Sequence, residues 1–147
     1  MFSDGTTIFI TFLLAIIGYN GLTITLLLSI KRKIPYLFWR IVTAIILFHV
    51  IMVWTYHYSW QFNVAVRNGY SGFIIFHSAL LFILISNFVK ENVAKILIRI
   101  SFVVVTIGAV GASFRYDVVS IYKIPVLICA VAGSVGLFFL FYQKRKN

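Results

Sequence analysis

The chain has 147 residues, of which 62% are hydrophobic and only 11% are charged, and its mean hydropathy is +1.03. A water-soluble domain carries roughly 25% charged residues, so this composition excludes an ordinary soluble protein and indicates a lipid environment. The net charge of +10 does not indicate nucleic-acid binding, because the basic residues cluster at the ends of long apolar blocks. We therefore expect an integral membrane protein whose surroundings are a lipid bilayer, with no nucleic-acid partner.

Five apolar blocks follow one another along the chain. Each has about 18 to 24 residues, enough for a helix to cross a hydrocarbon core of roughly 30 Å at 1.5 Å per residue. Their apolar residues run continuously instead of alternating, which excludes a β-barrel and predicts helices. We expect one domain over residues 1–147, an all-α bundle of five transmembrane helices. The predicted spans cover approximately residues 7–30, 38–60, 70–89, 96–114 and 121–142.

The basic residues predict the orientation of this bundle. With the N-terminus outside, all but three of the 13 basic residues fall on the inner side of the membrane, the exceptions being Arg67, Arg115 and Lys123. Because lysine and arginine accumulate in cytoplasmic loops, this bias predicts an N-terminus outside and a cytoplasmic C-terminus. We expect the protein in the cytoplasmic (inner) membrane of a bacterium.

The acidic residues and the single cysteine exclude several classes of function. Asp4, Glu91 and Asp117 are the only carboxylates, and all three are expected in loops or at the ends of spans. Ion-coupled transporters generally need an intramembrane carboxylate or a broken helix, and acid–base catalysis needs acids that converge at one depth. Cys129 is alone and forms no internal disulfide. We therefore expect no independent enzyme, and at most a part of an oxidoreductase complex.

Three histidines lie on the second and third blocks, which a short loop joins. His49 and His57 fall on the second block and His77 on the third, and the two helices are expected to pack as an antiparallel hairpin. Counted from the middle of the loop, His77 differs in depth from either partner by about one helical turn. His49 and His57 are eight residues apart and do not share a helix face. His77 with either His49 or His57 is therefore the predicted metal-ligating pair.

Two imidazoles without carboxylates or thiolates suit haem. Zinc requires three or four protein ligands, whereas haem iron needs only two axial ligands and fits an apolar slot between helices. Trp54 and Tyr56 belong to an aromatic group that is expected to wall the ring, and Arg67 and Arg115 are expected near the propionates. The arrangement is similar to small haem-b membrane anchors and cytochrome-oxidase assembly proteins, although no motif names a family. The sequence thus predicts one haem b.

Other interpretations of these residues stay open. Tyr56 and His57 suit the aromatic belt of a helix that leaves the bilayer, and His49 suits a hydrogen bond to a neighbouring helix. A quinone that accepts hydrogen bonds is a third use of the histidines. Small residues four apart predict close helix contacts, either inside the bundle or against a partner subunit. These pairs are Gly108 with Ala112, Ala130 with Ser134, and Ala132 with Gly136.

The sequence therefore favours two functions. The first is a haem-binding electron-transfer subunit or carrier of a respiratory chain, which exchanges electrons with a quinone or a protein partner. The second is a non-catalytic accessory or assembly subunit that binds the other membrane subunits of a larger complex. A small pore or a lipid-handling protein is less favoured, because no polar pathway runs through the spans.

Overall fold

The computed structural model describes residues 4–67, 69–115 and 121–146 of the chain. Within these ranges the regular structure is entirely helical, so the predicted all-α class is confirmed. The helices are, in chain order, α1 (Asp4–Lys31), α2 (Tyr36–Tyr56), α3 (Phe62–Ala65), α4 (Tyr70–Ile85), α5 (Glu91–Arg115) and α6 (Lys123–Lys146).

Four helices of the described chain, α1, α2, α5 and α6, are long and apolar enough to cross a membrane. The third predicted span, residues 70–89, corresponds to the shorter helix α4, which is strongly apolar but has only 16 residues. Sixteen residues make about 24 Å of helix, less than a hydrocarbon core of roughly 30 Å. The structure therefore supports a membrane-embedded bundle with four candidate spanning helices.

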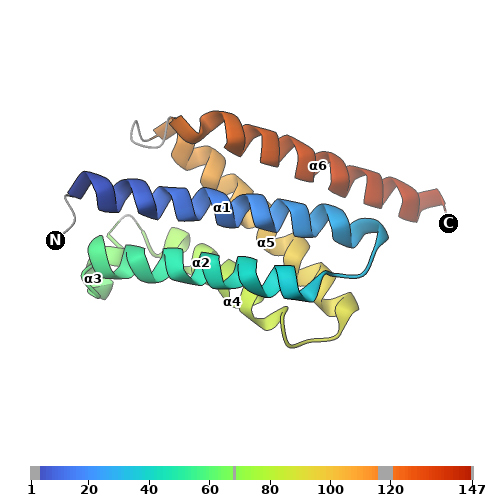
Figure 1. Cartoon of the computed structure of the whole chain (residues 1–147), viewed down its shortest axis with the longest axis horizontal. Helices are drawn as coiled ribbons and strands as arrows, with labels where there is room; N and C mark the ends of the chain where they lie inside the picture. The colour runs from blue at the N-terminus through green and yellow to red at the C-terminus, as the bar shows by residue number, and fades with distance from the viewer. Residues whose placement is uncertain (1–3, 68, 116–120, 147) are drawn as a thin grey trace.

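Helix α1 occupies the centre of the bundle. It lies between α2 and α6, with α4 and α5 behind it, and the two chain ends mark opposite ends of the long axis (Figure 1). The alternating direction of the helices brings the end of α1, the starts of α2 and α5 and the end of α6 together. We call this the basic end, because it holds Lys31, Arg40, Lys95, Arg99 and Arg145.

Two helices have boundaries that differ from those of the predicted spans. The second span is predicted to reach residue 60, but α2 ends at Tyr56, because Ser59 and Trp60 adopt φ values of 49° and 58° that reverse the chain. The fourth span is predicted from residue 96, but α5 begins at Glu91. An acidic residue stabilises a helix N-terminus, and the Glu91 carboxylate also bonds Lys95 Nζ at 3.0 Å, one turn later.

The expected α2–α4 hairpin is wrong. Helix α2 packs along α1, helix α4 packs along α5, and α2 and α4 meet in only a few places. Glycines explain the close α1–α2 contact: a methyl group at Gly18 would collide with Ile46, and one at Gly21 would collide with Val42. The two helices that carry the histidines are consequently held mainly by different neighbours.

The small residues at Gly108 and Gly136 serve packing inside the bundle. A methyl group on Gly108 would collide with the ring of Phe76 on α4, and one on Gly136 would collide with Leu27 on α1. At both positions the small residue therefore makes close helix contacts inside the bundle, the first of the two predicted alternatives. Ser134, by contrast, is exposed on α6.

Substituting Gly21 tests the α1–α2 contact. Gly21→Ala should destabilise the protein by about 1–3 kcal/mol, because the new methyl group meets the stiff, β-branched Val42. Gly111→Ala is the matched control, since no atom lies within 4 Å of its added methyl group; it should gain up to about 1 kcal/mol of helix propensity. Thermal unfolding in detergent micelles, followed by circular dichroism, measures both. Equal shifts in the two variants would contradict the close packing.

Candidate functional site

A cavity of about 620 Å³ lies towards the end of the bundle opposite the basic end. Its lining comes from α1, α2, α4, α5, α6 and the α2–α4 connection, and is mostly aliphatic and aromatic. Binding sites for small molecules and cofactors are apolar spaces of roughly 300–1,000 Å³ with a few convergent polar groups. The side chains here with polar groups are Tyr19, His49, Trp54, Tyr58, His77, Ser113 and Tyr122.

Hydrogen bonds close the space between α2 and α4 at the basic end. Trp39 Nε1 donates to Ser86 Oγ at 2.8 Å, and Asn87 Nδ2 donates to Thr43 Oγ1 at 3.0 Å. These bonds join the start of α2 to the residues that follow α4, and both Trp39 and Ser86 are fully buried. The cavity lies farther along the two helices, towards their other end.

His49 presents a hydrogen-bond acceptor to this cavity. Its Nδ1 lies 2.8 Å from the carbonyl oxygen of Thr11 on α1. Because a carbonyl oxygen only accepts, Nδ1 carries the proton, and the neutral ring then has a lone pair on Nε2. Among the described residues, no side chain or backbone group bonds this Nε2. The Thr11 carbonyl thus fixes the orientation of the His49 ring, as backbone carbonyl groups do for histidines that bind metal ions.

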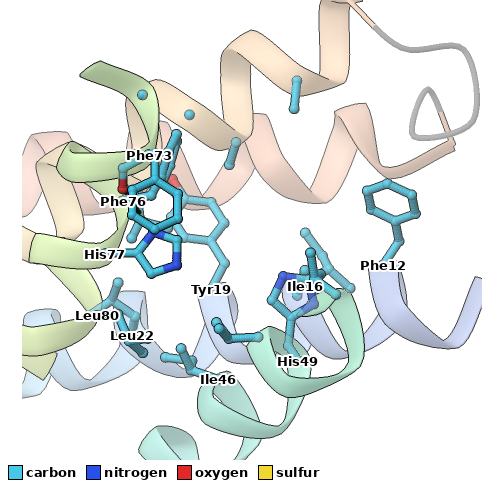
Figure 2. A pocket seen from close by; sticks show the side chains of 18 of the residues that line it. Phe12, Ile16, Tyr19, Leu22, Ile46, His49, Phe73, Phe76, His77 and Leu80 are labelled. Atoms are coloured by element: carbon cyan, nitrogen blue, oxygen red, sulfur yellow. Dashed lines mark hydrogen bonds between the residues drawn. The ribbon is translucent and has the colours of Figure 1, made fainter. Parts of the chain in front are cut away.

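His77 is oriented in the same way from the facing helix. Its Nδ1 donates to the carbonyl oxygen of Phe73 at 2.8 Å, one turn earlier in α4, and its ring stacks on that of Phe73 at a centroid distance of 3.9 Å. Its Nε2 accepts a 3.3 Å hydrogen bond from the indole N–H of Trp54. Figure 2 shows both histidines projecting into the same space, with Tyr19 of α1 between them in this view. Two imidazoles therefore bring Nε2 lone pairs into one cavity.

An aromatic cluster covers this end of the cavity. Trp54 contacts Tyr58 and Phe73 edge to face and stacks on Trp60 at a centroid distance of 5.7 Å. The left-handed backbone at Trp60 brings its amide within 3.0 Å of the Trp54 carbonyl oxygen. A bulky aromatic residue with positive φ is uncommon and persists only where its surroundings hold it. Ring contacts of Trp54 and the backbone hydrogen bond from Trp60 thus fix the start of the α2–α4 connection beside the cavity, while the Trp60 side chain is 64% exposed.

The structure brings together only some of the predicted site residues. His49, His77 and Trp54 line the cavity, whereas His57 caps the end of α2 and is exposed. Tyr56 is 59% exposed and lies outside the lining. The other predicted residues are the two arginines. Arg67 is exposed and outside the lining, and the side chain of Arg115 lies outside the part of the chain that the structure describes. Within that part, no group of three histidine, cysteine or carboxylate residues is arranged to hold a metal ion by itself.

Tyr122 is a site residue that sequence reasoning missed. It lies just before α6 and lines the cavity, and its hydroxyl group is buried without a hydrogen-bond partner in the described structure. A buried hydroxyl left unpaired costs about 1–3 kcal/mol. Nothing in the sequence distinguishes Tyr122 from the interfacial tyrosines, because its burial depends on how α6 packs. The described residues therefore leave the hydrogen-bonding capacity of this hydroxyl group unused.

Paired removal of two hydroxyl groups tests this assignment. Tyr122→Phe should stabilise the ligand-free protein by about 1 kcal/mol, because it removes an unsatisfied group. Tyr19→Phe should destabilise it by about 1 kcal/mol, because the Tyr19 hydroxyl lies 2.8 Å from Thr106 Oγ1 in a hydrogen bond. Thermal unfolding in micelles compares the two. Shifts of the same sign would show that the Tyr122 hydroxyl has a partner after all.

Comparison with known proteins adds no assignment to this geometry. No protein family model matches the chain, and no curated protein or solved structure is similar to it. The cavity and its side chains are therefore the basis for a functional proposal.

Proposed function

We propose that the protein is a small membrane haem protein, which holds one haem b in the cavity with His49 and His77 as axial ligands. The observation that carries this proposal is the matched pair of imidazoles. Each ring has its Nδ1 bonded to a backbone carbonyl at 2.8 Å, and each brings Nε2 to the same apolar cavity. Haem iron needs two axial protein ligands because the porphyrin supplies the other four.

The lining suits a flat apolar ring. Phe12, Phe73 and Phe76 offer aromatic faces, and aliphatic residues of α1, α2 and α5 complete the walls. A bound haem would supply a one-electron redox centre at membrane depth. The chain's own contribution is to orient the two imidazoles and to exclude water with the aromatic cluster around Trp54.

Binding at His77 requires Trp54 to give up its hydrogen bond. That bond is 3.3 Å long, beyond the usual range for N–H donors, and a net hydrogen bond is worth about 1 kcal/mol. This cost is small beside the gain from a metal–imidazole bond. Trp54 Nε1 thus satisfies the His77 lone pair in this structure, and a haem held by His77 would replace this hydrogen bond.

The carboxylates of a haem need donors at the edge of the cavity. Tyr122 supplies a buried hydroxyl without a partner. Arg67 and Arg115 stand two residues in sequence from the lining residues Gly69 and Ser113. Arg67 is exposed, and the side chain of Arg115 lies outside the described structure. We assign the propionates to this group of donors.

The proposal includes a position in the membrane. We place a fifth crossing at α4, whose 16 residues are strongly apolar and would require a locally thinner bilayer. Five crossings with the basic end inside give an external N-terminus and a cytoplasmic C-terminus, in a bacterial inner membrane. There the haem would exchange electrons with a quinone or a partner subunit of a respiratory chain.

An absorption spectrum tests the haem. The protein, expressed with haem precursor and purified in detergent, should show a Soret band that shifts on reduction with dithionite. His49→Ala and His77→Ala should each lower the haem content at least tenfold, because each removes an axial ligand. His57→Ala is the matched control and should keep the band, since His57 is exposed outside the cavity.

Two results would overturn the proposal. One is a well-folded protein without a reducible Soret band when haem is supplied. The other is loss of the band in His57→Ala with retention in His49→Ala, which would replace the axial pair. Circular dichroism of each variant separates loss of haem from loss of fold.

A further inference from the structure

Arg99 lies in a groove on the side of the bundle formed by α5 and α6, away from the histidines. The groove has a volume of about 270 Å³, and its other lining residues are Ile100, Val103, Val104, Leu137 and Phe141. Arg99 is the eighth residue after the start of α5, about 12 Å along the helix. Its side chain therefore leaves α5 among apolar residues and not at the tip of the basic end, and it lines the groove with its apolar stem.

Among the described residues, no acidic side chain forms an ion pair with Arg99. Its Nε is buried without a hydrogen-bond partner in the described structure. The chain has only three acidic residues. Glu91 is paired with Lys95 at 3.0 Å, while Asp4 begins α1 at the opposite end and Asp117 follows the far end of α5 in sequence. A charged side chain at membrane depth is costly unless it meets a partner, so the anion has to come from outside the protein.

We propose that this groove binds one anionic phospholipid, with its phosphate on Arg99 and an acyl chain along Val103 and Leu137. Basic pockets between helices on the cytoplasmic side are typical sites for anionic headgroups, and a guanidinium group matches phosphate geometry. Arg145 lies one turn beyond the lining residue Phe141 on the same face of α6, so a second cation stands at the mouth of the groove. The apolar lining suits the lipid chain and not a free phosphate ion.

The site does not depend on the haem. It lies towards the other end of the bundle and shares no lining residue with the large cavity. The close contact of Gly133 on α6 with the ring of Phe102 on α5 lies outside the groove. A lipid in the groove would hold the two helices together beyond that contact. Its role is thus to anchor the protein in an anionic leaflet at a defined position.

Native mass spectrometry of the intact chain tests the site. The wild type, released from micelles doped with phosphatidylglycerol or phosphatidylcholine, should retain one phosphatidylglycerol molecule in preference to phosphatidylcholine. Arg99→Gln should lower the retained phosphatidylglycerol about fivefold, the effect of losing one interfacial cation. Arg40→Gln is the matched control, because Arg40 is an exposed arginine of the same end outside the groove, and its retention should equal that of the wild type.

Val103→Phe gives a second measurement that keeps Arg99 and fills the groove instead. It should also lower lipid retention, and it decides the question if Arg99→Gln fails to fold. Equal retention by the wild type, Arg99→Gln and Val103→Phe would overturn the proposal. So would equal retention of the two lipids, or displacement of phosphatidylglycerol by millimolar inorganic phosphate, which would indicate a free anion site.

Discussion

The supply of hydrogen-bond partners inside the bundle constrains the whole structure, because lipid offers none to a polar group. The central helix α1 meets this constraint largely within itself: Thr23, Thr25 and Ser29 donate to backbone carbonyls three or four residues earlier. Other polar groups are satisfied between helices, as in the Trp39–Ser86 and Tyr19–Thr106 pairs. A buried polar atom without a hydrogen-bond partner therefore marks a place where a molecule outside the bundle would form the missing bond.

Those unpaired atoms fall largely at the two hollows. In the described structure the buried atoms without a partner are Asn87 Oδ1, Arg99 Nε and Tyr122 Oη. Tyr122 lines the large cavity and Arg99 lines the smaller groove. Asn87 lies at the closed end, where its amide nitrogen already bonds Thr43. Two independent observations, an available space and an unsatisfied group, thus coincide at each proposed site.

The sequence predicts the helices well and their neighbours poorly. Apolar blocks locate four of the spanning helices because hydrocarbon demands long apolar runs, but aromatic residues such as Trp60 suit either a helix or a turn in the interface. The choice between His49 and His57 depended on where α2 ends, because the helix stops at Tyr56 and leaves His57 exposed. The expected hairpin is wrong because Gly18 and Gly21 allow α2 to pack closely on α1. This contact could not be predicted from the glycines alone, since it depends on Ile46 and Val42, which face them.

The cavity of about 620 Å³ lies where α2 and α4 are packed mainly against different neighbours, α1 and α5. Because its lining is mostly apolar, an apolar ligand would gain contacts there. Hydrogen bonds hold the helices together on either side of the space, by Trp39 and Ser86 at the basic end and by Trp54 and His77 at the other. Of these two ties, the buried bond at 2.8 Å is the shorter, whereas the 3.3 Å bond from Trp54 is long for an N–H donor and occupies the Nε2 lone pair of His77. The tie beside the cavity is therefore the weaker of the two.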